Sequence, residues 1–163
     1  MRAVLRNMEG GFRLTKKQVK IVVCILQAVL VGILFLPSAN SGDSGGAALN
    51  TFGLVKKYSD IGHNIDALAY IMMAICSPVI TALSAVQLRE RKNFGIGVCL
   101  SGLTSFVHAI FYTVVKTFMS GSVTVNGLHY LIILIALINL FIEIYGFLLA
   151  NPEEKKGKKG RPH

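Results

Sequence analysis

Residues 128–150, LHYLIILIALINLFIEIYGFLLA, form an apolar run with a single charged residue, Glu143. A helix that crosses the hydrocarbon core of a bilayer needs about 20 predominantly apolar residues, so this run predicts a transmembrane helix. Two more runs of this kind lie at residues 67–88 and 94–115. A fourth run, residues 21–36, is slightly short. It reaches spanning length as residues 19–36, because a lysine at a helix end can extend to the headgroups. The sequence therefore predicts an all-α membrane protein, a four-transmembrane-helix bundle that forms one domain over residues 1–150.

The composition supports a membrane protein and argues against nucleic-acid binding. Of the 163 residues 53% are hydrophobic and 15% are charged, whereas soluble domains have about 25% charged residues. The net charge of +9 would suggest a nucleic-acid partner in a soluble protein, but here the basic residues cluster between apolar runs. The chain has no Trp and no aromatic stacking platform interleaved with basic residues, so no nucleic-acid partner is predicted. Cys24, Cys76 and Cys99 each lie inside an apolar run, which predicts packing residues and neither a disulfide nor a zinc site.

The distribution of Lys and Arg predicts the orientation in the membrane. Six basic residues come before or at the start of the first run, three lie between the second and third runs, and five lie in the C-terminal tail. The other two loops hold only Lys56, Lys57 and Lys116. Segments rich in Lys and Arg stay cytoplasmic, so we expect both termini on the cytoplasmic side of a plasma membrane.

The first run also has features of a cleaved signal peptide, since it follows a basic segment and ends in Leu36-Pro37-Ser38-Ala39. Cleavage after Ala39 would place Pro37 at a position where a small residue is needed, and the basic segment is unusually long. An uncleaved first span is the preferred prediction.

Two terminal segments are expected to lie outside the bundle. Near the N-terminus, Met1, Val4, Leu5 and Met8 follow helical spacing, which predicts either a short interfacial helix or a flexible basic lead. The tail, residues 151–163, is rich in Lys and Gly and is predicted to be a disordered cytoplasmic segment. Both basic termini are expected to bind anionic lipids of the bilayer.

The one sizeable outer loop covers residues 37–65. Its first half, residues 38–46, is small and polar and is predicted to be mobile. In its second half, Asn50 or Thr51 is expected to cap a short helix that carries Phe52, Val55 and Tyr58 and rests on the bundle. Loops of this length are often functional, so specificity is expected here, although a merely covering loop is the alternative.

Small residues at every fourth position of the third run predict a helix-packing face, since helices in lipid associate through close contact at small residues. The partner of this face is either another helix of the chain or a second copy in a homo-oligomer. The residues of this stripe are Gly97, Ser101, Ser105, Ala109 and Thr113.

Glu143 is the one carboxylate inside a predicted span, and a charge within the hydrocarbon region is costly. Asn139 lies one turn earlier on the same face, and Gln27 and Ser84 are expected at a similar depth. These four residues could form a polar cluster that binds a proton or cation. The preferred alternative is that Glu143 reaches the inner interface or pairs with a basic residue of the neighbouring loop, Arg89, Arg91 or Lys92.

A second set of polar residues is expected near the outer surface: His63, Asp66, His129 and His108. His and carboxylate side chains can bind transition metals, but this spacing matches no ligand motif, so no metal site is predicted. His108 is instead expected to form a hydrogen bond across helices, to a Ser or to Tyr70.

No nucleophile, zinc-protease or phosphate-binding motif is present, so neither an enzyme nor a cofactor is predicted. The preferred function is a non-catalytic accessory, immunity or assembly protein that acts on a membrane-protein partner through helix packing and the outer loop. The alternative is a small proton-coupled transporter that uses Glu143. A membrane enzyme acting on lipid or quinone is the third and least favoured class.

Overall fold

The computed structural model of the chain describes residues 14–42 and 46–150. The predicted interfacial helix at residues 1–8 and the predicted disordered tail at residues 151–163 lie outside the described residues.

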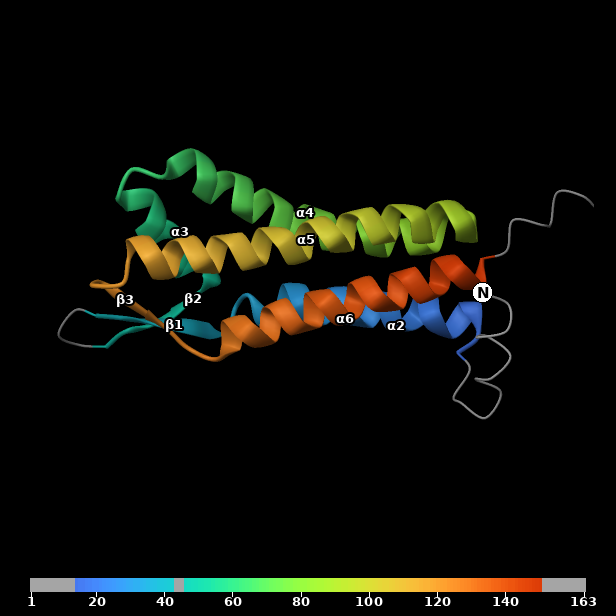
Figure 1. Ribbon diagram of the computed structural model, residues 1–163, viewed down its shortest axis with the longest axis horizontal. Helices are drawn as coiled ribbons and strands as arrows, with labels where there is room; N and C mark the ends of the chain where they lie inside the picture. Colours follow the sequence, from blue (N-terminus) through green and yellow to red (C-terminus); the bar gives the residue numbers. More distant parts are fainter. Residues whose placement is uncertain (1–13, 43–45, 151–163) are drawn as a thin grey trace, which may run out of the picture.

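Four long helices lie side by side and make up most of the molecule (Figure 1): α2 (Lys16–Ile33), α4 (Asn64–Gln87), α5 (Glu90–Phe118) and α6 (Leu128–Leu149). Helix α2 contacts α4 and α6, and α5 contacts the same two helices, so the four enclose a shared interior. The start of α2 and the end of α6 lie at one end of the bundle, here named the terminal end. A small sheet lies at the opposite end, here named the sheet end.

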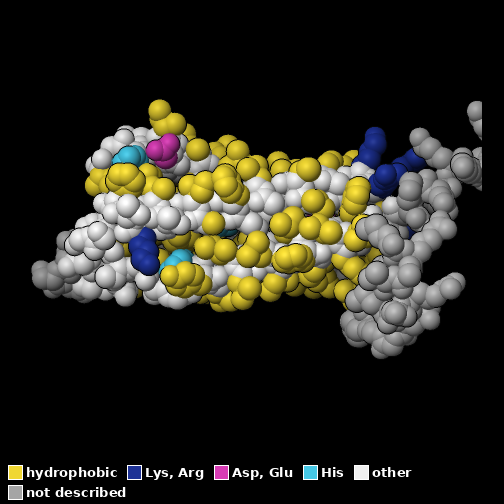
Figure 2. Space-filling view, viewed as in Figure 1, with side chains coloured by type: hydrophobic (Ala, Val, Ile, Leu, Met, Phe, Trp, Pro, Cys, Tyr) yellow, Lys and Arg dark blue, Asp and Glu magenta, His cyan; other side chains and the backbone are white. Residues whose placement is uncertain are grey.

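Three of these helices, α4, α5 and α6, are long and apolar enough to cross a membrane, which confirms three of the predicted spans. Helix α2 has 18 residues and carries three lysines, Lys16, Lys17 and Lys20, near its start. Apolar side chains cover the sides of the bundle between its two ends (Figure 2). Such a surface is compatible with an integral membrane protein, because lipid chains are as apolar as these side chains.

Local sequence explains where α2 begins and how α4 and α5 are joined. The Thr15 hydroxyl accepts a hydrogen bond from the Gln18 backbone N–H, and the Gln18 side chain accepts one from the Thr15 backbone. This reciprocal pair is a capping box, which satisfies backbone donors at a helix start. Helix α4 ends at Gln87 and α5 begins at Glu90, so the two are antiparallel neighbours as predicted. Helix α5 is longer at both ends than the predicted run at residues 94–115.

The sheet end contains an antiparallel sheet, so the prediction of an all-α fold was wrong in this region. Residues 38–41 of the segment predicted to be mobile form a strand, and residues 43–45 of it lie outside the described residues. Strand β1 (Pro37–Ser41) lies between β2 (Ala48–Asn50) and β3 (Val123–Val125). The sequence of β1, PSANS, has little intrinsic strand preference. Its pairing with β3 is a long-range contact between two different loops, which local sequence does not signal.

The predicted short helix is confirmed as α3 (Thr51–Asp60). The Asn50 side chain caps it by accepting a hydrogen bond of 2.9 Å from the Gly53 N–H. Leu54 and Tyr58 are buried, and α3 contacts α4, so the helix rests on the bundle as expected. Gly62, with φ of 104°, turns the chain from α3 into α4, in a conformation that side chains other than glycine rarely adopt.

Replacing Asn50 with alanine is expected to destabilise α3 by about 1 kcal/mol, because one backbone donor at the helix start loses its partner. Hydrogen exchange should then be faster at the first amides of α3 than in wild type. Lys56→Ala is the matched control, because Lys56 lies on the same helix and is exposed. Unchanged exchange in the Asn50 variant would contradict the capping role.

Buried apolar side chains form two separate cores. The larger one lies toward the sheet end and includes Leu30, Leu54, Tyr58, Phe111 and Ile132. The smaller one lies toward the terminal end and consists of Val19, Val23, Phe94 and Ala150, with partly buried neighbours. Between these two cores most of the buried side chains are polar, and these form the candidate site.

Candidate functional site

A layer of buried polar side chains separates the two apolar cores, and all four long helices contribute to it. It is here named the polar layer. Such a concentration of polar groups is unusual inside a bundle whose outer surface is apolar, and polar residues at membrane depth are usually functional. Its members are Gln27 from α2, Ser77, Thr81 and Ser84 from α4, Asn93, Ser101, Thr104 and Ser105 from α5, and Asn139 and Glu143 from α6.

Hydrogen bonds across helices satisfy part of the polar layer. The hydroxyl groups of Ser77 and Thr104 lie 2.6 Å apart and join α4 to α5. Ser84 donates to the Asn93 side-chain carbonyl at 2.9 Å, which is a second link between the same helices. The Gln27 amide nitrogen lies 3.4 Å from the Ser101 hydroxyl and connects α2 to α5 across the interior.

Glu143 is 1% exposed, and neither of its carboxyl oxygens has a hydrogen-bond partner among the described residues. Its carboxyl group lies against Gly97 of α5, where an added Cβ atom would collide with it. One turn away the arrangement is reversed, because the Phe94 ring of α5 lies against Gly146 of α6. Each helix therefore inserts one side chain at a glycine of the other, and this double contact fixes the position of the carboxyl group.

The structure differs from the preferred prediction that Glu143 reaches the interface or pairs with a basic residue of the neighbouring loop. Glu143 is buried instead of reaching the interface, and within the described part of the chain it makes no ion pair with Arg89, Arg91 or Lys92. The Arg91 guanidinium instead lies 6.0 Å from the centre of the Phe147 ring, at the outside of the bundle. The reason is geometric, since the side chain of Glu143 points into the interior at Gly97 and the basic side chains are exposed.

Asn139 lies one helical turn from Glu143 and is also 1% exposed. Both polar atoms of its side-chain amide lack a partner within residues 14–42 and 46–150, and so does the side-chain nitrogen of Asn93. Buried polar groups are almost always hydrogen-bonded, so this group of unpartnered atoms requires an explanation.

The predicted cluster of Glu143, Asn139, Gln27 and Ser84 therefore lies entirely within the polar layer. One further member of the polar layer was placed elsewhere by sequence. Asn93 lies between the predicted runs at residues 67–88 and 94–115, which places it in a loop, whereas it is a buried residue of α5. The signal was available, because Asn93 lies four residues before Gly97 and extends the small and polar stripe of this helix.

The predicted packing stripe is only partly buried. Gly97, Ser101 and Ser105 face the interior, Ala109 is half-buried and Thr113 is exposed. A repeat of four residues advances about 400° around a helix with 3.6 residues per turn, so the stripe drifts by about 40° at each step. Beyond Ser105 the buried face of α5 passes instead to residues spaced three or four apart: His108, Phe111, Tyr112 and Val115.

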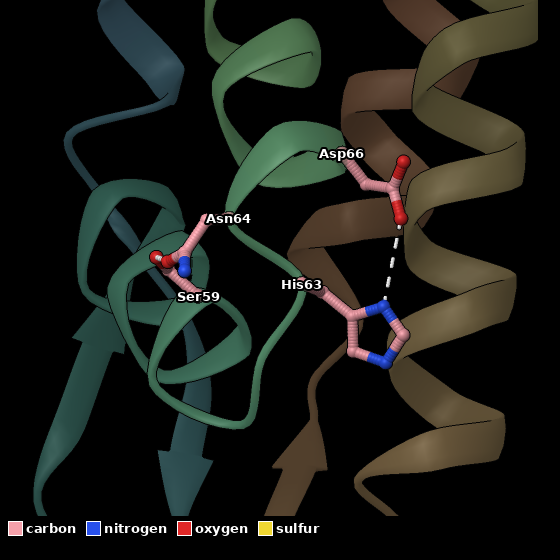
Figure 3. Close-up of polar contacts among 4 residues, drawn as sticks. All are labelled: Ser59, His63, Asn64 and Asp66. Atoms are coloured by element: carbon pink, nitrogen blue, oxygen red, sulfur yellow. Dashed lines mark hydrogen bonds and ion pairs between the residues drawn. The ribbon is translucent and has the colours of Figure 1, made fainter.

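The second predicted cluster does not assemble. His63 and Asp66 form a pair with 3.5 Å between Nδ1 and a carboxyl oxygen, beside a hydrogen bond from Ser59 to Asn64 (Figure 3). His108 lies deeper in the bundle, where its Nδ1 is 3.0 Å from the Tyr70 hydroxyl, as predicted for a bond across helices. His129 contacts the backbone carbonyl of Asn126. No group of three His, Cys, Asp or Glu residues that could hold a metal occurs in the described part of the chain.

Comparisons of this chain with protein-family models, with curated proteins and with solved structures found no match in any of the three. Its function is therefore argued from its own geometry.

Proposed function

We propose that the chain is an integral membrane protein with four spans, in which α2 is the fourth, and that both termini are cytoplasmic in the plasma membrane. Two observations support this arrangement. Helix α2 packs against two of the apolar helices, α4 and α6 (Figure 1). The basic residues of the α4–α5 turn and of the start of α2 lie together at the terminal end, which is the pattern expected of a cytoplasmic side.

Within that arrangement, we propose a non-catalytic accessory or assembly protein that presents its sheet end to a membrane-protein partner. The observation that carries this proposal is that two separate loops fold into one layer. Strand β3, from the loop between α5 and α6, pairs with β1, which follows α2. The Asn126 side chain donates to the Pro37 carbonyl at 2.8 Å, and the Gly42 N–H donates to the Ser122 carbonyl at the same distance.

This layer is also tied to the bundle beneath it. The Thr51 and Tyr112 hydroxyl groups lie 3.2 Å apart, which links the start of α3 to α5. The Thr51 N–H donates to the Leu34 carbonyl at the end of α2. A loop that merely joined two helices would not need these connections. These hydrogen bonds support a binding surface that is already ordered before a partner arrives. Such preorganisation lowers the entropy lost on binding.

The exposed face of the sheet is the proposed contact surface. Asn40 lies opposite Ala48 on one side and Thr124 on the other, and all three side chains are exposed. These side chains are short and uncharged, so a partner backbone can approach the sheet closely.

The proposal is tested by a double substitution, Asn40→Arg with Thr124→Arg, which places two large charges on this face. We expect the variant to fold as wild type and to lose a stoichiometric partner that copurifies with wild type from its native membrane in mild detergent. Gln87→Arg is the matched control, since Gln87 is exposed at the other end of the bundle. Retention of the partner by all three proteins, or recovery of the wild-type chain alone, would overturn the proposal.

A further inference from the structure

The polar layer brings together one carboxyl group and several neutral oxygen-bearing side chains, and some of these have no partner. Glu143 and Asn139 together have four polar side-chain atoms that are buried and unpartnered among the described residues. Ser101, one turn from Gly97 on α5, meets Gln27 of α2 on the other side of the interior. From this geometry we infer that the polar layer is a binding site for one monovalent cation, a proton or Na⁺, carried by the carboxyl group of Glu143.

The charge of the site selects a monovalent ion. Glu143 is the one acidic side chain among the buried residues that the structure describes. A single negative charge in an apolar interior is very unfavourable, and one bound positive charge removes it. A divalent ion would leave a net positive charge in the same surroundings. Carboxylate, amide and hydroxyl oxygens are the ligands of hard cations, which excludes the softer transition metals.

The packing around the carboxyl group indicates that its position is specified. Position 97 of α5 has to be glycine, because the Cβ atom of any other residue there would overlap the carboxyl group of Glu143. The neighbouring contact of Phe94 with Gly146 holds α5 and α6 in register. Asn139, one turn along α6, can offer its carbonyl oxygen to Na⁺ or accept a hydrogen bond from a protonated carboxyl group.

The groups that face Glu143 from the other helices are uncharged. Helix α5 presents Gly97 to the carboxyl group, and the buried side chains that α4 and α5 add to the polar layer are uncharged. Helix α2 carries the uncharged side chains of Gln27 and Cys24, and Lys20 lies one turn before Cys24, nearer the terminal end. The carboxyl oxygens of Glu143 accept no hydrogen bond from any basic side chain within residues 14–42 and 46–150, and we assign the neutralising charge to a bound ion.

The terminal end is the expected entry side. Glu143 lies six residues before the last residue of α6, which corresponds to about 9 Å along the helix at about 1.5 Å per residue. The smaller apolar core on that side contains four buried apolar side chains among the described residues, whereas the core on the sheet side is much larger.

The test uses the full-length chain in mild detergent and dicyclohexylcarbodiimide, an apolar reagent that adds to protonated carboxyl groups. We expect mass spectrometry to find the label on Glu143, with labelling that falls at least tenfold as the pH is raised. If the ion is Na⁺, NaCl should lower the labelling further at a fixed pH, whereas choline chloride should not. If the ion is a proton, the two salts should act alike.

Two comparisons make the result specific. Glu143→Gln should remove the label while leaving the fold, judged by circular dichroism and gel filtration, unchanged. A water-soluble carbodiimide should label the exposed acidic residues and not Glu143. The inference is overturned if Glu143 stays unlabelled at every pH in the folded protein, or if its labelling does not depend on pH.

Ion binding goes beyond the proposed accessory function and does not depend on it. Loss of the partner from the sheet-face variant and loss of the label from Glu143→Gln are separate measurements, so either proposal can fail while the other holds. The alternative function predicted from sequence, proton-coupled transport, would use this same site.

Discussion

Gly146→Ala is expected to destabilise the bundle by about 1–3 kcal/mol, the range found when atoms are inserted into a well-packed core. The new methyl group would overlap the ring of Phe94, which is fully buried and cannot move aside as a flexible side chain would. The α5–α6 pair should separate, and the contact of Glu143 with Gly97 should loosen with it. The measurement is unfolding by a denaturing detergent, followed by circular dichroism.

The matched control is Gly102→Ala on the partner helix. An added Cβ there would lie 3.8 Å from the nearest atom of Leu140, which is an ordinary contact. Alanine favours helix over glycine by up to about 1 kcal/mol, so this variant should be as stable as wild type or more stable. Phe94→Leu should partly rescue Gly146→Ala, because it removes the ring that the methyl group overlaps. Equal loss in both glycine variants would mean that the Phe94 contact is not the cause.

Leu54→Ala is expected to cost about 2–5 kcal/mol, which is the usual range for such a substitution at a fully buried site. Leu54 is 0% exposed, and its side chain joins α3 to the larger apolar core, of which it is a member. Because α3 is only 10 residues long, most of its stability comes from packing and little from its own helix propensity. We expect hydrogen exchange to become fast in α3 and β2, while the middles of α4, α5 and α6 stay protected.

Tyr58, on the same helix, is buried as well, so Leu54→Ala should be compared with a substitution on the exposed side. Lys56→Ala serves for this purpose and should leave exchange unchanged. If Leu54→Ala gave uniform fast exchange throughout the bundle, α3 would be part of the same cooperative unit as the long helices.

The long helices were predictable because each is specified by its own residues. The run at residues 128–150 differs from the observed α6 by one residue, and the Asn50 cap of α3 was expected from local chemistry alone. Strand β1 was not predictable for the opposite reason. Its residues are Pro, Ser, Ala, Asn and Ser, and what makes them a strand is pairing with residues about eighty positions later.

The sequence predicted which residues belong to the candidate site, but it did not predict how they contact one another. A carboxylate within an apolar run is visible in any sequence, and the periodicity of α6 places Asn139 on the same face. The contact between Glu143 and Gly97 depends on how α5 and α6 are aligned, which no local pattern contains. The stripe of small residues on α5 predicted too long a packing face, because Thr113, its last member, lies on the exposed side of the helix.

The pairing of β1 with β3 also sets an order of events during synthesis. Strand β1 leaves the ribosome long before β3, and at about 5–20 residues per second the interval is on the order of 4–16 s. During that interval β1 lacks one of its two neighbours, and the sheet can be completed only after the chain has passed through α5. A closed sheet therefore requires that the third long helix, α5, has been made and that its last residues lie at the sheet end.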